Sequence, residues 1–392
     1  MLAGTLFIGG LLLGLYPYVG YPLLARLAAS LVGRRVDDSS SSSSSSSASP
    51  ATSAPSVSVV ISAYNEARHI EATVRNKLLQ RYPGSLEILV ASDGSTDGTD
   101  EIVRRIAADE PRVSLHRQEP RAGKTSALND LVTKASGEIL VFSDANSLYD
   151  GEAIAHLVSN FADPTVGYVT GRMIYVNPDG TPVGDGNTAY MRYENSLRAT
   201  ETALGSVVGV DGGVDAVRRR LYRPMRADQL PDFVLPLDVV SQGYRVVYEP
   251  AALLTEDALS EGGAEYRMRV RVALRALWAL ADKAALLRGG AGLLFAWQLW
   301  SHKLLRYLSF VPFALAWVAG LVLSIGGGAP LLVLLFALYN AVLLLALAGA
   351  AGLAVGPARY AYYFLLLNLA SAKATWRFLK GEKQVLWQPR GG

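Results

Sequence analysis

Two apolar, β-branched runs in this chain each end in an aspartate, and this pattern constrains the fold more than any other feature. The first run, LEILVAS at 86–92, precedes Asp93, and the second, EILVFS at 138–143, precedes Asp144. In an open parallel sheet, ligands bind beyond the carboxyl ends of the strands. Two acids at that edge predict a site for a nucleotide and for a phosphate held by a metal ion.

The first third of the chain alternates between strand and helix patterns. Strands are expected at 57–63, 86–92, 113–116 and 138–143, and helices at 67–80, 97–108 and 123–135. This alternation predicts a parallel sheet with right-handed crossovers. The region from 165 to 257 is more mixed, with strand patterns at 166–176 and 244–250 around a helical pattern at 191–204. We therefore expect an α/β fold with a mixed, mainly parallel sheet.

Both ends of the 392-residue chain are apolar, whereas most charged residues lie between them. Residues 3–25 carry no charge and are long enough to cross a bilayer core about 30 Å thick. A signal peptide is the alternative, but a basic start and a small-residue cleavage site are missing. An uncleaved anchor is therefore expected. Arginines follow at positions 26, 34 and 35, which predicts that residues 34 onward lie in the cytosol.

The C-terminal third is apolar again. Residues 308–326 and 329–354 are predicted membrane spans, whereas 360–372 are short for a span and are interrupted by an asparagine. The basic residues that follow favour the cytosol, so this last segment is expected to lie at the interface or to re-enter the membrane. The number of C-terminal spans and the side of the C-terminus stay open. Residues 293–308, with two tryptophans and a basic cluster, have the pattern of an amphipathic interfacial helix.

Composition excludes several other classes of function. The formal net charge is +3, and no Lys/Arg-rich block with interleaved aromatic residues is present, so nucleic acid is not an expected partner. The chain has no cysteine, which excludes disulfides and thiolate metal sites. Its four histidines lack the paired spacing of a zinc site.

Further polar residues follow the predicted strands. Asp144 and Asn146 are two positions apart, so on an extended path their oxygens point to one side. Mg²⁺ or Mn²⁺ prefers such oxygen ligands and shares them with substrate phosphates. Lys124 stands at the start of a predicted helix, where the helix dipole favours anions and disfavours a cation. A lysine at this position is explained if it binds a diphosphate together with the free backbone amides. The alternatives, a surface lysine and an ordinary capping role for Asp93, stay open. Glu66 brings a third acid to the same edge.

Taken in order, these motifs resemble a known family. SVVISAYNEARHIEATVRNKLLQRYPGSLEILVASDGSTDGT, RAGKTSALN and GEILVFSDANS together resemble the nucleotide-binding half of family 2 glycosyltransferases with the GT-A fold. GVDGGVDAVRRRLY, LPDFVLPLDVVSQGYRVVYEPAA and EYRMRVRVALRAL are similar to the acceptor half of their membrane-bound members. Those members include cellulose, chitin, hyaluronan and poly-N-acetylglucosamine synthases. The resemblance covers residues 57–306.

The resemblance implies a role for each residue at the sheet edge. Glu66 and Asp93 would hold the uridine or an equivalent nucleoside. The diphosphate and its metal ion would be held by Lys124, Asp144 and Asn146. The expected cofactor is therefore Mg²⁺ or Mn²⁺, and the expected donor is a nucleotide-sugar, with a UDP-sugar favoured.

The general base has two candidates. In the family, the base precedes a helix that leads into G-Y-R-V-x-Y, which favours Asp232. Asp257 is the alternative because it ends a literal Thr-Glu-Asp, although it comes after that helix; Asp238 is expected to be a structural helix residue. Gly212 and Gly213 would let an acceptor sugar approach the backbone.

The family's Q-x-x-R-W motif is not intact here. In its place stand three arginines and a tryptophan: Arg267, Arg269, Arg271 and Trp278. Arg269 and Arg271 are expected to neutralise the leaving diphosphate, since guanidinium groups match phosphate oxygens well. The alternative is a basic helix that lies on anionic lipid headgroups. The missing R-W pair puts a polymerising activity in doubt.

These inferences give six expected regions. They are a transmembrane anchor (1–33), a Ser-rich flexible linker (34–55), a GT-A glycosyltransferase domain (56–282), an amphipathic interfacial segment (283–307), C-terminal transmembrane helices (308–378) and a basic tail (379–392). We expect a multi-pass protein of the cytoplasmic membrane with its catalytic domain in the cytosol. It would be an inverting glycosyltransferase acting on a membrane-associated glycan or lipid, with polysaccharide synthesis as one form of that activity.

Two other functions stay open. The first is a transferase that adds a single sugar to a lipid acceptor, such as a polyprenyl phosphate or a glycolipid. The second is a membrane scaffold or export subunit whose nucleotide site has decayed. The small number of predicted spans would require oligomers or an export partner if the product is a translocated polymer.

Overall fold

The computed structural model describes residues 2–33, 54–176, 182–257, 262–353 and 355–386. Most of the predicted Ser-rich linker and the end of the predicted basic tail lie outside these residues. The described chain divides into two compact units. The sheet unit comprises residues 32–174, 195–256 and 384–392, and the helical unit comprises residues 1–31, 175–194 and 257–383.

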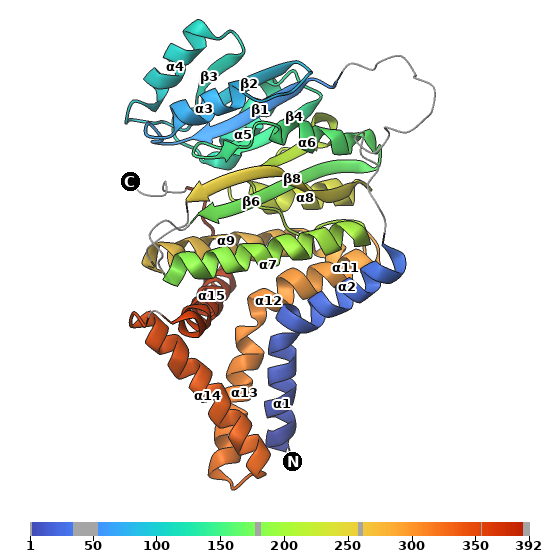
Figure 1. The fold of residues 1–392 in the computed structure, drawn as a ribbon, viewed down its shortest axis with the longest axis vertical. Coiled ribbons are helices and arrows are strands. Elements are labelled where there is room, and N and C mark those ends of the chain that lie inside the picture. Colours follow the sequence, from blue (N-terminus) through green and yellow to red (C-terminus); the bar gives the residue numbers. More distant parts are fainter. Residues whose placement is uncertain (1, 34–53, 177–181, 258–261, 354, 387–392) are drawn as a thin grey trace. The chain divides into compact units, whose positions relative to one another are not determined.

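The described strands form one sheet of eight, in the order β3-β2-β1-β4-β7-β6-β8-β5 (Figure 1). The strands are β1 (Val57–Ala63), β2 (Leu86–Ser92), β3 (Val113–Arg117), β4 (Ile139–Asp144), β5 (Leu148–Tyr149), β6 (Val166–Val176), β7 (Asp215–Arg218) and β8 (Arg245–Asp257). The first four pair in parallel, whereas β7 is antiparallel to both β4 and β6, and β5 is antiparallel to β8. The predicted mixed α/β sheet is confirmed.

The helices of the sheet unit connect these strands in the predicted order. They are α3 (Ile70–Leu78), α4 (Thr99–Asp109), α5 (Lys124–Lys134), α6 (Ala153–Ser159) and α8 (Pro231–Ser241), with α7 (Pro182–Leu204) running through both units. Right-handed crossovers place α3 and α4 on one face of the parallel strands, and α5, which returns the chain to β4, on the other. α7 begins nine residues before its predicted start at 191, and β8 extends to Asp257.

The core of the sheet unit lies at β1 and β4. All seven residues of β1 are buried, as expected for a central parallel strand covered on both faces. The chain order reverses between these two strands, and such a switch point opens a crevice at the carboxyl ends. Ser62 of β1 is in register with Asp144 of β4, so the segments that follow both strands meet at this crevice.

The helical unit contains the apolar ends of the chain. Its further helices are α1 (Leu2–Leu15), α2 (Tyr21–Val32), α9 (Gly262–Asp282), α10 (Ala284–Leu287), α11 (Leu293–Leu299), α12 (Leu305–Leu308), α13 (Phe310–Ile325), α14 (Pro330–Ala350) and α15 (Gly356–Leu379) (Figure 1). Apolar side chains of α9 pack against α15, and those of α1 pack with α13 and α14. A buried Glu194 of α7 forms ion pairs with Arg306 and His302.

Two of the described helical segments, Leu2–Leu31 and Pro330–Ala350, are long and apolar enough to cross a membrane. The predicted N-terminal anchor and the predicted span at 329–354 thus have the required helices. The predicted span at 308–326 does not stand alone, since α13 qualifies only together with Leu293–Leu308, from which it is bent by 54°. The described residues therefore offer two spans, or up to three if that bent pair is one span.

Two segments of the C-terminal region differ in extent from their sequence patterns, while their predicted place at the membrane interface stays a prediction. The segment 360–372 is the middle of α15, a continuous helix of 24 residues, because the flanking polar residues that hide it from a hydropathy pattern are good helix formers. The single amphipathic helix expected at 293–308 is interrupted by a π-helical turn at Trp300–Leu304. That turn brings His302 and Lys303 to the side of Glu194.

Candidate active site

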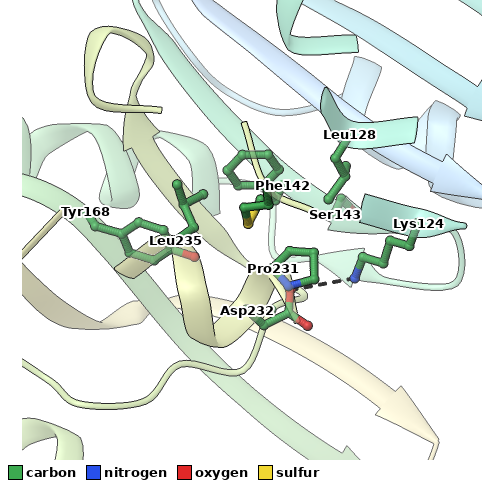
Figure 2. A pocket seen from close by; sticks show the side chains of 10 residues that line it. Lys124, Leu128, Phe142, Ser143, Tyr168, Pro231, Asp232 and Leu235 are labelled. Atoms are coloured by element: carbon green, nitrogen blue, oxygen red, sulfur yellow. Dashed lines mark ion pairs between the residues drawn. The ribbon is translucent and has the colours of Figure 1, made fainter. Parts of the chain in front are cut away.

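Three predicted site residues from three elements of the sheet unit meet at the crevice. The Lys124 Nζ at the start of α5 lies 2.7 Å from the Asp144 Oδ1 at the end of β4. The same Nζ lies 3.7 Å from the Asp232 Oδ1 in the first turn of α8 (Figure 2). Their side chains keep 21%, 35% and 27% exposure, so all three are accessible to a ligand. One ammonium group thus links the predicted metal ligand to the predicted base.

Asp232 is positioned by the start of its helix and by α5. Pro231 occupies the first turn of α8, and its fixed φ favours helix initiation at that position. An acid in this turn is also favoured by the helix dipole. The segment leading to α8 is fixed by Thr125, whose hydroxyl donates to the Gln229 carbonyl at 2.8 Å. Asn129 holds the preceding turn through the Met225 carbonyl at 2.7 Å.

Asp93 lies at the end of β2, fully buried, and organises the loop that precedes Lys124. Its carboxylate accepts hydrogen bonds from the side chain of Gln118 at 2.6 Å and from the backbone N–H groups of Ala122 and Gly123 at 2.9 and 3.1 Å. Arg121 Nε donates to its other oxygen at 3.2 Å. Asp93 therefore fixes the N-terminus of α5, and its predicted contact with the nucleoside stays a prediction.

The other predicted nucleoside ligand follows β1. Glu66 is half-buried, and its backbone N–H donates to the Thr99 hydroxyl at 2.9 Å. Two residues earlier, the Tyr64 ring stacks under the Arg121 guanidinium, with 3.4 Å from ring centroid to Cζ. The segments after β1 and β3 are thus joined at the crevice, on the side where the nucleoside is predicted.

The predicted metal loop after Asp144 is held in place by hydrogen bonds from α3. Thr73 Oγ1 donates to the Ala145 carbonyl at 2.8 Å, and Lys77 Nζ donates to the Ser147 carbonyl at 2.6 Å. Asn146, between them, is half-buried and makes no hydrogen bond to another described residue. The loop is therefore anchored on both sides of the amide that is predicted to bind metal.

Lys77 was not singled out by sequence reasoning. It is fully buried, lies 3.7 Å from the centroid of the Tyr149 ring, and its pKa is held well below the usual value by burial. Together with Thr73 and Asn76 it forms a polar stripe at i, i+3 and i+4, which places all three on one helix face. This polar stripe on a helix face that is otherwise buried is the sequence signal that could have identified Lys77.

The two glycines predicted to face an acceptor are both required by packing. Gly212 has a φ of +87°, and a Cβ there would lie 2.2 Å from the Asp232 Cγ. A Cβ on Gly213 would lie 2.7 Å from a methyl group of Leu254. Gly212 thus lets the loop before β7 pack directly on the predicted base. The approach of an acceptor sugar at these glycines stays a prediction.

The remaining predicted residues belong to the helical unit. Arg269 of α9 is largely buried there and donates to Glu265 at 2.8 Å, to Asn187 at 3.0 Å and to the Tyr363 hydroxyl at 2.7 Å. Arg271 is half-buried on the same helix. Asp257, the alternative base, ends β8, and its side chain lies outside the described part of the chain. The roles of all three stay predictions.

Comparison with known proteins agrees with this geometry. The sequence profile of glycosyl transferase family 2 matches residues 58–223, which include the ends of β1, β2 and β4. Over nearly its full length the chain is similar to a solved mannosyltransferase from Pyrobaculum calidifontis, in complex with GDP-Man and Mn²⁺. The TM-score is 0.71 and the identity 27%, over 95% of this chain and 99% of that one. Residues 58–223 are a glycosyl transferase family 2 domain.

Curated relatives match a smaller part of this glycosyltransferase. A poly-β-1,6-N-acetyl-D-glucosamine synthase from Staphylococcus aureus is 27% identical over 59% of this chain and 56% of its own. A β-monoglucosyldiacylglycerol synthase from Nostoc is 30% identical over 43% of this chain and 36% of its own. The chain thus spans little more than half the length of the staphylococcal relatives it matches.

The glycosyltransferase offers oxygen donors for a divalent cation. No group of three or more His, Cys, Asp or Glu side chains that could hold a metal occurs among the described residues. Asp144 and Asn146 instead provide one carboxylate and one amide at the open end of β4. Mg²⁺ and Mn²⁺ typically take few protein ligands and complete their shell with substrate phosphates and water. The donor set therefore fits such a cation when a nucleotide diphosphate is bound.

Proposed function

We propose that this glycosyltransferase moves a hexose from a nucleotide-sugar to a membrane-associated acceptor with inversion at the anomeric carbon, and that Asp232 is the general base. The observation that supports it most is the cluster of Lys124 with Asp144 and Asp232, since it puts diphosphate, metal and base functions within one crevice. The apolar helices at both ends support an acceptor that stays in a membrane.

In the proposed step, Asp232 accepts the proton of the acceptor hydroxyl while that oxygen attacks the anomeric carbon. The bond from that carbon to the diphosphate oxygen breaks, and the nucleoside diphosphate leaves. Lys124 and the N-terminus of α5 face the departing diphosphate and stabilise its developing charge. A divalent cation held by Asp144 and Asn146 would supply further positive charge to the same oxygens.

Glu66 and Asp93 are the proposed nucleoside side of the site. Asp93 supports it through the loop that it anchors, and Glu66 through its place after β1. Arg269 and Arg271 are proposed to help neutralise the leaving group. For Arg269 this would require exchange of its bonds to Glu265, which makes its contribution conditional on a rearrangement within α9 and its neighbours.

The donor is proposed to be a nucleoside-diphosphate hexose. A UDP-sugar follows from the family resemblance, whereas the full-length likeness to a mannosyltransferase in complex with GDP-Man supports a GDP-sugar as the second candidate. The acceptor is proposed to be a lipid or a growing glycan. Addition of a single sugar is favoured because the Q-x-x-R-W pattern of the polymerising relatives is replaced by separate arginines.

A polymerising activity is the competing proposal. It is supported by the likeness to poly-β-1,6-N-acetyl-D-glucosamine synthase. If it holds, the few spans of this chain would call for a homo-oligomer or an export partner. Multi-pass insertion with the catalytic domain in the cytosol is proposed under either activity, because nucleotide-sugars are cytosolic.

The test is a donor screen with the full chain in detergent. UDP- and GDP-hexoses are incubated with a membrane lipid extract, with and without Mn²⁺, and released nucleoside diphosphate is measured. We expect metal-dependent release from one donor class, increased by the extract. Release from no donor under any condition would contradict the proposed function and favour a scaffold role. Product length on a gel then separates single addition from polymer synthesis.

A further inference from the structure

Asp215, the first residue of β7, is a buried carboxyl group that the proposed mechanism does not use. Its side chain has no solvent exposure, and neither carboxyl oxygen has a hydrogen-bond partner among the described residues. Buried polar side chains are normally hydrogen-bonded, so a carboxyl group in this state calls for an explanation.

The strand register places Asp215 beside the predicted base. It lies opposite Phe142 of β4 and Thr170 of β6, and directly opposed residues on paired strands share one face of the sheet. Phe142 and Tyr168, on that same face, line a cavity of about 10 Å³ together with Asp232 (Figure 2). That volume is about the minimum that holds one water molecule. Asp215 therefore lies on the sheet face that borders this cavity, and Asp232 of α8 borders the same cavity.

The guanidinium group of this region is engaged elsewhere. Arg198 of α7 makes a buried bidentate ion pair with Asp211, with Nη1 to Oδ2 and Nη2 to Oδ1 both at 2.5 Å. Its Nε also donates to the Gly209 carbonyl at 3.1 Å. Arg198 thus holds the loop before β7 in place, and its hydrogen bonds go to Asp211 and Gly209 rather than to Asp215.

The titratable and charged groups around Asp215 come from five elements. They are Asp232 of α8, Asp211 of the preceding loop, Arg198 of α7, Tyr168 of β6 and Tyr149 of β5. Burial raises the pKa of Asp215 to about 7; the Thr170 hydroxyl opposes this rise, and the like charges of Asp232 and Asp211 add to it. The carboxyl group therefore changes charge within the range where enzymes of this kind are assayed.

We propose that Asp215 is a positioning residue for the general base, and that its charge state sets the proton affinity of Asp232. The inference rests on the proposed role of Asp232. With Asp215 neutral, the base faces an uncharged acid. Once Asp215 ionises, its negative charge lies close to that of Asp232. This disfavours the anionic form of Asp232 and makes Asp232 a stronger base. Transfer should then accelerate as pH rises through neutrality.

The experiment compares the pH profile of kcat/KM for the wild-type full chain and for Asp215→Asn between pH 5.5 and 9, with the donor found by the screen. In the wild type, we expect a rise of about three- to tenfold centred near pH 7, corresponding to a change of up to one pKa unit in the base. In Asp215→Asn this rise disappears, while activity below pH 6 stays close to that of the wild type.

Asp238→Asn is the matched control, because it makes the same chemical change on the base's own helix at a half-buried position. It should keep the wild-type rise. Identical profiles for the wild type and Asp215→Asn would overturn the proposal, as would loss of the rise in Asp238→Asn as well. If Asp232→Asn proves fully active, the assignment of the base fails instead, so the two failures are distinguishable.

A second variant keeps the proposal testable if Asp215→Asn does not fold. Thr170→Val removes the hydroxyl that faces Asp215 across the β6–β7 pair and makes its surroundings less polar. The carboxyl group should then ionise at higher pH, and the rise in kcat/KM should move upward by about half a pH unit or more. A rise that stays at the wild-type pH would contradict the proposal.

Discussion

Two fully buried aspartates of the sheet unit, Asp93 and Asp215, stand in opposite environments. Asp93, where the sugar donor is proposed to bind, accepts hydrogen bonds from four residues, whereas Asp215, near the proposed base, accepts none from the described residues. Hydrogen bonds replace the water that a buried polar group loses, so the four partners of Asp93 compensate for its burial. Asp215 instead has a pKa raised to about 7, so it gains or loses a proton near neutral pH.

This difference suggests a division of labour in the crevice. Under the proposed function, the loop around Asp93 has to keep one shape, because Arg121, Gly123 and the N-terminus of α5 lie where the diphosphate is proposed to bind. The strands around Asp215 instead lie beside the proposed base, which under the proposed function exchanges a proton in every turnover. Three substitutions sharpen or break the comparison, in decreasing order of expected effect.

Replacing the well-paired acid should have the largest effect. Asp93→Ala leaves Arg121 and two backbone N–H groups without their acceptor, so we expect the free energy of unfolding to fall by about 3 to 5 kcal/mol. Urea unfolding of the full chain in detergent measures this. Asp130→Ala, at an exposed position of α5, is the control and should change it by less than about 0.5 kcal/mol. A loss below about 1 kcal/mol for Asp93→Ala would show that its hydrogen bonds are dispensable.

Replacing Asp215 should change the free energy of unfolding by a smaller amount, in the stabilising direction, and this change should depend on pH. The pKa of Asp215 is raised to about 7 in the folded chain, so its contribution to stability is complete below pH 4 and is lost as pH rises through 7. The Asp215→Asn variant does not lose stability in this way, because an amide does not ionise over this pH range. Its stability relative to wild type should therefore increase by about 2 to 3 kcal/mol between pH 5 and 8. A difference that does not change with pH would contradict the assigned ionisation.

The parallel half of the sheet could be predicted from the sequence for a physical reason. Its strands are buried on both faces, so their sequences are continuous apolar runs. The acids that follow these runs are therefore easy to recognise. The positions of Asp93, Lys124 and Asp144 at one edge followed directly. Asp232 could be placed only through the resemblance to a family, because the sequence does not reveal how α8 packs on the sheet.

Other parts of the site were not readable from the sequence. Asp215 stands in a short antiparallel strand next to three arginines, where an acid is typical of a surface. Its burial depends on pairing with β4 and β6, which are distant in the chain. Likewise, α15 was underestimated because polar residues at both of its ends hide a continuous helix from a hydropathy pattern.

Lys77, buried beside the predicted metal loop, extends the comparison to a third buried titratable side chain. Lys77→Met keeps the apolar stem but removes the hydrogen bond to the Ser147 carbonyl, so the loop that carries Asn146 loses an anchor. We expect the free energy of unfolding to fall by about 1 to 2 kcal/mol, because the buried Ser147 carbonyl loses its hydrogen-bond donor. The Mn²⁺ concentration for half-maximal activity should rise about 10- to 100-fold. The control Lys134→Met, at an exposed lysine of α5, should leave it unchanged.

The central claim is that Asp232, in the first turn of α8, is the general base. The most direct measurement compares sugar transfer and nucleoside diphosphate binding in Asp232→Asn and Asp257→Asn. The account predicts that Asp232→Asn lowers kcat by about 10²- to 10⁴-fold and leaves the Kd for the nucleoside diphosphate near that of the wild type, whereas Asp257→Asn keeps most of the transfer. Substantial turnover by Asp232→Asn, together with loss of turnover in Asp257→Asn, would contradict it.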